Sequence, residues 1–138
     1  MRLVLDTNIL ISALLSRKGP PGQLLELWDE GGVYTLLSAE AQLDELLRAS
    51  RYPKLRTRLE LSAVDEAVRA IRKLATMVSD LPVLDISPDP NDNFILAIAQ
   101  AGQADLLVTG DKRGLLDLVE HGGTRIVTAV AALARVKG

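Results

Sequence analysis

The stretch Arg2-Leu3-Val4-Leu5-Asp6-Thr7-Asn8, followed by Ile9-Leu10-Ile11, decides the fold of this chain. An apolar run of strand length leads into a short polar turn, and apolar residues at helical spacing follow at once, which predicts a buried strand feeding a helix. Asp6 then lies at the carboxyl end of a strand, where ligands bind in open α/β sheets. The alternative role for Asp6 is that of a helix N-cap, which Asp, Thr and Asn all serve.

Length and composition indicate one folded domain that spans residues 1–138. Hydrophobic residues make up 48% of the chain, which argues against disorder, and we expect neither a leader peptide nor a membrane span. Cysteine is absent, so disulfides and thiolate chemistry are excluded and a cytoplasmic location is favoured. The net charge of −2 argues against a protein that coats nucleic acid, but not against an enzyme that binds it briefly.

Strands are expected to alternate with helices along the whole chain. After the first strand, further strands are predicted at 33–37, 83–84, 105–108 and 125–127, and helices at 9–15, 23–30, 39–50, 54–59, 62–77, 94–101, 115–120 and 129–136. Ser38 is expected to cap the third of these helices, and His121 to end a helix ahead of Gly122-Gly123. This alternation predicts an α/β fold with a mostly parallel sheet that is covered by helices on both faces. The loops that follow the strands then gather along one edge of the sheet.

Four acidic residues fall where such loops or the following helices begin, namely Asp6, Glu45, Asp92 and Asp111. Each has an ordinary explanation when taken alone, because Asp is common in caps and turns and Glu on exposed helix faces. Together, converging carboxylates repel one another unless a cation compensates them. Mg²⁺ and Mn²⁺ prefer oxygen ligands and polarise phosphoryl oxygens, so the set indicates phosphodiester hydrolysis.

Other hydrolytic mechanisms lack the residues they need. His121 is the single histidine, so a ribonuclease that uses two histidines as acid and base is excluded. A Ser-His-Asp triad would have to use the same histidine, and no nucleophile-elbow sequence is present. The chain also carries no Walker sequence and no dinucleotide glycine fingerprint.

Four segments together resemble the PIN-domain family. They are Leu-Asp-Thr-Asn-Ile-Leu-Ile-Ser-Ala (5–13), Leu-Asp-Glu-Leu-Leu (43–47), Pro-Asp-Pro-Asn-Asp-Asn-Phe-Ile-Leu-Ala-Ile-Ala (88–99) and Ala-Asp-Leu-Leu-Val-Thr-Gly-Asp-Lys (104–112). Within the family, the chain is most similar to VapC-like proteins described as toxin components of prokaryotic toxin–antitoxin pairs. The resemblance implies a three-layer PIN-like fold, with a central mostly parallel sheet flanked by helices.

The resemblance also implies a Mg²⁺- or Mn²⁺-dependent ribonuclease that acts on single-stranded or looped RNA, with one or two metal ions. By this likeness Asp6, Asp92 and Asp111 hold metal, and Glu45 is a ligand directly or through water. The supporting polar positions of the family fall on Asn8 and Thr109. A homodimer and a cognate antitoxin are the implied partners. Asp89 competes with Asp92 for the third acidic position, because the same loop offers both.

Positive charge near the site would assist RNA binding. Lys112 and Arg113 follow Asp111 directly and are predicted to contact the RNA backbone, while 48–58 is the densest basic run and is equally well explained as a solvated helix face. Two other functions remain open. One is a catalytically inert PIN-like module that binds RNA or protein, and the other is a receiver-like domain in which an Asp accepts phosphate.

Overall fold

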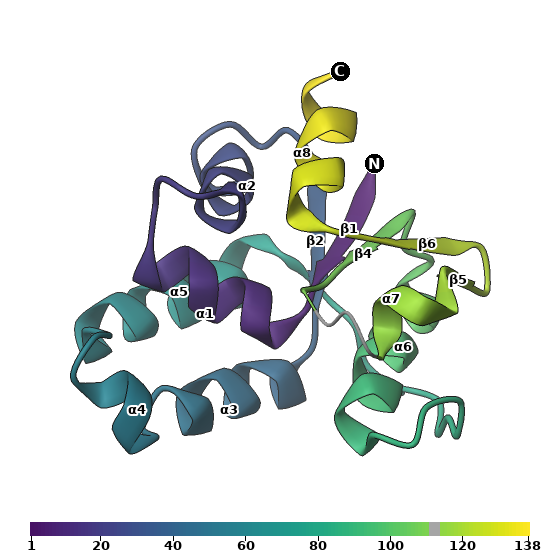
Figure 1. The fold of residues 1–138 in the computed structure, drawn as a ribbon, viewed down its shortest axis with the longest axis horizontal. Helices are drawn as coiled ribbons and strands as arrows, with labels where there is room; N and C mark the ends of the chain where they lie inside the picture. The colour runs from purple at the N-terminus through teal and green to yellow at the C-terminus, as the bar shows by residue number, and fades with distance from the viewer. Residues whose placement is uncertain (111–113) are drawn as a thin grey trace.

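The computed structural model describes residues 1–110 and 114–138. This part of the chain has eight helices and six short strands, which are arranged as Figure 1 shows. The strands are β1 (Arg2–Leu5), β2 (Thr35–Ser38), β3 (Thr76–Met77), β4 (Leu106–Val108), β5 (Glu120–His121) and β6 (Thr124–Val127). The helices are α1 (Thr7–Leu15), α2 (Pro20–Asp29), α3 (Glu40–Ala49), α4 (Pro53–Arg56), α5 (Leu61–Leu74), α6 (Pro90–Gly102), α7 (Leu115–Leu118) and α8 (Ala129–Lys137).

The strands form one sheet in the order β3-β2-β1-β4-β6-β5. All neighbouring pairs are parallel except β5 and β6, which are antiparallel. β1 lies at the centre, with Val4 opposite Leu37 of β2 on one side and opposite Leu107 of β4 on the other. The predicted α/β fold with a mostly parallel sheet is therefore confirmed, and the carboxyl ends of β1 and β4 lie at the same edge.

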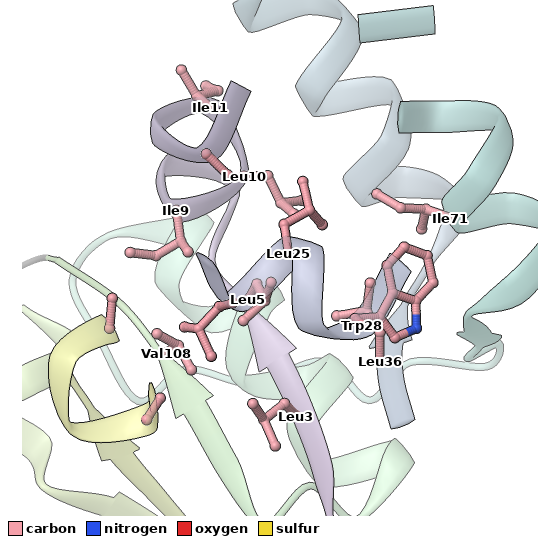
Figure 2. Packing of buried hydrophobic residues seen from close by; sticks show 14 of the residues in the cluster. Leu3, Leu5, Ile9, Leu10, Ile11, Leu25, Trp28, Leu36, Ile71 and Val108 are labelled. Atoms are coloured by element: carbon pink, nitrogen blue, oxygen red, sulfur yellow. The ribbon is translucent and has the colours of Figure 1, made fainter. Parts of the chain in front are cut away.

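Side chains alternate between the two faces of the sheet and build two separate cores. Leu3 and Leu5 pack on the face covered by α1, α2, α3, α5 and α8, as Figure 2 shows around Leu25 and Trp28. Val4 points to the other face, where α6 and α7 supply the cover. This arrangement gives the three layers of helix, sheet and helix that Figure 1 shows.

The predicted strand at 83–84 is wrong, and the edge strand β3 forms earlier in the chain. Val83 is fully exposed in an irregular segment, so it has no buried face to stabilise a strand. The helix expected over 62–77 ends at Leu74 instead, and Thr76 pairs with Leu37 of β2. The β-branched side chain of Thr76 favours this extended conformation over a continued helix.

His121 does not end a helix, because α7 stops at Leu118 and His121 belongs to β5. Gly122 and Gly123 both have positive φ, at 54° and 86°, and they join β5 to β6 as a two-residue hairpin loop. Such loops require positive φ at both positions, which Gly-Gly supplies without steric cost. Glycine is also common at helix ends, and for this reason the sequence wrongly predicted a helix up to His121.

No helix within 1–110 or 114–138 is both long and apolar enough to cross a membrane.

Candidate active site

Asp6 lies at the carboxyl end of β1, where β1 and β4 run side by side. Its backbone N–H donates to the carbonyl oxygen of Val108 at 2.9 Å, which extends the β1–β4 pairing to this residue. The hydroxyl of Thr109 donates to Asp6 Oδ2 at 2.8 Å. Although Asp6 holds the N-cap position of α1, its side chain makes no capping hydrogen bond. The carboxylate is thus tied to the neighbouring strand rather than used to start the helix.

Burial raises the pKa of Asp6 to about 6, because only 9% of the residue is exposed and its charged form is poorly solvated. The negative charges of Asp92 and Glu45 raise this pKa further. The Thr109 hydroxyl and the backbone N–H of Thr7 act in the opposite direction. Three of the four predicted acidic residues therefore interact electrostatically, although they come from separate segments of the chain.

Asp92 and Asp89 have different roles in the loop before α6. Asp89 is exposed and caps the helix, since its Oδ1 accepts the backbone N–H of Asn91 at 2.9 Å. Pro90 follows at the first helical position, where a missing N–H costs nothing. Asp92 is buried in the first turn, and its Oδ2 accepts the Ser87 hydroxyl at 3.1 Å. The geometry brings Asp92 toward Asp6, whereas Asp89 organises the helix start.

The helix predicted to begin at Phe94 therefore begins four residues earlier, and Asp92 is inside it. Asn93 fixes the preceding loop: its Oδ1 accepts the backbone N–H groups of Ile86 and Ser87, and its Nδ2 donates to the Ser87 carbonyl. These bonds position the Ser87 hydroxyl next to Asp92. Sequence reasoning missed Ser87, and Ser is too common in loops for its presence to have been informative.

Glu45 is half-buried on α3, and Gln42 fixes the position of that helix. Gln42 is 1% exposed, its Nε2 donates to the Leu5 carbonyl at 2.7 Å, and its Oε1 accepts the Ser38 hydroxyl at 2.6 Å. Ser38 therefore does not cap α3, whose N-cap is Ala39. Sequence reasoning also missed Gln42, although a polar residue four positions before the buried Leu46 was a signal that could have been found.

Asp111, Lys112 and Arg113 lie outside the described residues. Of the supporting positions, Thr109 contacts Asp6 directly, while Asn8 is exposed in the first turn of α1. Asn8 and Glu45 line a pocket of about 200 Å³. Asp92 lines a separate pocket of about 450 Å³ beside α7.

The donor set of this region is made only of oxygen and amide groups. Within 1–110 and 114–138, no three acidic or histidine side chains are arranged to hold a metal ion by themselves. Mg²⁺ nevertheless keeps several waters and often takes only one or two carboxylates from the protein. Its hard-oxygen preference fits Asp6, Asp92 and Glu45, whereas a zinc site would need His or Cys ligands that this region lacks.

A family model for the PIN domain matches residues 2–113. The match includes Asp6 at the end of β1, Glu45 on α3 and Asp92 in the first turn of α6. The chain belongs to the PIN-domain family. PIN domains are generally nucleases and generally use divalent metal ions. The resemblance noted from the four sequence segments is thereby confirmed, and the receiver-like alternative loses its support.

MJ1680 and a chain of VapBC2 are among the proteins that are similar to this PIN domain. The uncharacterized protein MJ1680 of Methanocaldococcus jannaschii is 28% identical over 113 residues, which cover 81% of this chain and 72% of that protein. A chain of the crystal structure of VapBC2 from Rickettsia felis, bound to a DNA fragment from their promoter, superposes with a TM-score of 0.61 at 22% identity. The match covers 93% of this chain and 98% of that chain, and it establishes a shared fold.

Proposed function

We propose that this PIN domain is a metal-dependent endoribonuclease that hydrolyses phosphodiester bonds of single-stranded or looped RNA. The observation that carries the proposal is the buried Asp6, on which the charges of Asp92 and Glu45 converge. Such an arrangement is unfavourable in the protein alone, because like charges and burial both oppose ionisation. A bound divalent cation would offset the repulsion between the carboxylates. Because PIN domains are generally nucleases, we infer that such a cation supports phosphodiester hydrolysis.

We assign Asp6, Asp92 and Asp111 as ligands of Mg²⁺ or Mn²⁺, with Glu45 a ligand directly or through water. A cation bound there would polarise the phosphoryl oxygens and activate water for attack on phosphorus. Lys112 and Arg113 follow Asp111 in the sequence and would attract the RNA backbone.

The protein's own contribution is to hold the carboxylates in place. Thr109 fixes one oxygen of Asp6, and Ser87 fixes one oxygen of Asp92. Gln42 holds α3 against the carboxyl end of β1, and Glu45 follows on the same helix three residues later. Asp6 and Asp92 are thus each held by a side-chain hydrogen bond, and Glu45 is placed through the helix that carries it.

We further propose that the enzyme is the toxin of a toxin–antitoxin pair, acts in the cytoplasm as a homodimer and is restrained by a cognate antitoxin. The likeness to VapC-like proteins supports this biological role, as does the fold shared with a chain of VapBC2. A small neighbouring gene for a DNA-binding protein would support it further.

The test is cleavage of a panel of single-stranded RNAs in the presence of Mg²⁺, Mn²⁺ or EDTA. We expect cation-dependent cutting by the wild type and its loss in Asp6→Asn and Asp111→Asn. Asp65→Asn is the matched control, because Asp65 is an exposed residue of α5 outside the site. Folded wild-type protein that binds RNA but cuts none with either cation would overturn the nuclease and favour the inert binding module.

A further inference from the structure

The pocket beside Glu45 has the composition of a binding site for one unpaired nucleobase. Its volume is about 200 Å³, below the range of roughly 300–1,000 Å³ typical of drug-sized ligands, so it suits a single ring system. Ile11 and Ala49 give it an apolar lining, while Asn8 and Asn91 supply amide donors and acceptors. The pocket joins α1 and α3 to the first turn of α6, and so borders the acidic site on the side of α3.

One wall of this pocket is a regular stripe that leads away from the acidic site. Glu45, Arg48, Ala49 and Tyr52 are spaced three, four and seven residues apart, and all four line the pocket. Within α3 this spacing places Glu45, Arg48 and Ala49 on one face of the helix. Tyr52 follows the end of α3, and 60% of it is exposed. An exposed aromatic ring beside amide groups is the usual platform on which proteins stack unpaired RNA bases.

Arg48 adds a positive charge at the same place. Arg48 is exposed. Among the described residues it forms no ion pair, since the ion pair found there joins Arg72 to Glu40. Arg48 also lines a neighbouring pocket of about 310 Å³ together with Arg51, so positive charge continues along the surface from the base pocket. A guanidinium in this position matches the geometry of a phosphate group.

Thr7 gives an independent indication that a ligand binds here. It lines the pocket and is 3% exposed, and its Oγ1 is a buried side-chain atom without a hydrogen-bond partner in the described residues. Buried hydroxyl groups are almost always paired, because an unpaired one costs free energy. Threonine in a helix uses two χ1 rotamers, so this hydroxyl can turn toward a ligand without backbone movement.

We propose that this pocket binds the unpaired base of a nucleotide next to the cleaved bond, with Tyr52 stacking on the base and Arg48 holding the adjoining phosphate. The proposal rests on the proposed nuclease function for the position of the cleaved bond, and it makes Tyr52 and Arg48 substrate-binding residues. Thr7, Asn8 and Asn91 contact the edge of the base. Stacking accepts any base, while the amides select among them.

The experiment measures binding of two labelled probes in EDTA, where no cation supports cutting. One probe is a short single-stranded oligouridylate and the other is an abasic ribose-phosphate chain of equal length. We expect Tyr52→Ala to raise Kd for the oligouridylate roughly 5- to 150-fold and Tyr52→Phe to change it less than about twofold, because stacking needs only the ring. The abasic chain should bind the wild type and Tyr52→Ala equally. Thr7→Val should weaken oligouridylate binding, and Thr7→Ser should not.

Arg48→Gln should weaken both probes and reduce the salt dependence, with Arg135→Gln on the exposed face of α8 as the matched control. Equal oligouridylate binding by the wild type and Tyr52→Ala overturns the base pocket, as does a wild type that binds neither probe. The two proposals fail separately. A protein that cuts RNA while Tyr52→Ala binds normally loses only the base pocket, and one that binds through Tyr52 but never cuts loses only the nuclease.

Discussion

Replacing Asp6 by Asn should stabilise the cation-free protein at neutral pH, although it removes a central residue of the site. Burial raises the pKa of Asp6 from its ordinary value of 3.8 to about 6. A raised carboxyl pKa means that the folded state holds its proton more tightly than the unfolded state, so folding stability is lost as the pH rises from about 4 to above 6. A shift of about two pKa units corresponds to roughly 3 kcal/mol, and asparagine avoids this cost because it carries no charge.

The assay is urea unfolding in EDTA at about pH 4.5 and about pH 7.5, compared between the wild type and Asp6→Asn. Roughly 2 of the 3 kcal/mol should be lost between these two pH values, because at the lower pH part of the cost is already present. The two proteins differ only at residue 6, so the difference between the two stability curves reports the ionisation of Asp6 together with its interactions with Asp92 and Glu45. Asp65→Asn serves as the control and should parallel the wild type.

Adding Mg²⁺ or Mn²⁺ at about pH 7.5 should make the wild type more stable than Asp6→Asn. A ligand that binds only the folded state stabilises it by about 4.1 kcal/mol at one thousand times its Kd, which exceeds the cost of roughly 3 kcal/mol, and Asp6→Asn should gain much less. The reasoning is refuted if the two proteins have the same pH dependence in EDTA. It is equally refuted if Asp6→Asn is the less stable of the two at neutral pH without a cation.

Three further predictions concern the site and the packing of α2. Asp89→Ala should lower the free energy of unfolding in urea by about 1 kcal/mol through the lost cap, and it should leave Mn²⁺ affinity unchanged in titration calorimetry. Asp92→Asn should instead weaken Mn²⁺ binding in the same calorimetric assay. Gly22→Ala should lower the unfolding free energy by about 1–3 kcal/mol in urea, because the added Cβ would lie 2.5 Å from the Ser16 carbonyl oxygen. Lys112→Ala combined with Arg113→Ala should flatten the dependence of RNA affinity on salt by about 1.4 logarithmic units per tenfold change, and an unchanged slope contradicts their contact with the backbone.

The buried layers of the fold were predictable because their signal is local and repeated. Leu3, Val4 and Leu5 form an unbroken apolar run, as do the residues of β4, and central parallel strands are buried on both faces. The helices were recognisable from their apolar stripes, and α5 shows this with buried Val64, Val68 and Ile71. Since only the pattern of apolar residues is needed to predict these layers, other sequences with the same pattern would give the same prediction.

The ends of helices and strands were less predictable, because the same pair of residues can end a helix, start a helix or form a turn. Gly122-Gly123 satisfies a helix end and a hairpin loop equally, and only the pairing of β5 with β6 decides between them. Asp89-Pro90 and Asp92 both fit a helix start, and in the structure Asp89 caps α6 while Asp92 is buried in its first turn. Tertiary context therefore selected among local alternatives that the sequence left open.

The supporting residues of the site were the least predictable, and the physical reason is the distance along the chain. Thr109 is 103 residues from Asp6, and Gln42 reaches the carbonyl of Leu5 across 37 residues. A hydroxyl or amide that acts over such separations leaves no periodic trace in its own neighbourhood. Asp6, Glu45 and Asp92 could be singled out because they share one chemistry, and their charges interact in the structure. Their partners differ in type: Thr109 was predicted through the family resemblance alone, whereas Ser87 and Gln42 are recognised only in the folded structure. A polar residue on the apolar stripe of a helix, as Gln42 is, remains the one such clue that can be sought in a sequence, because burial without a partner would be too costly.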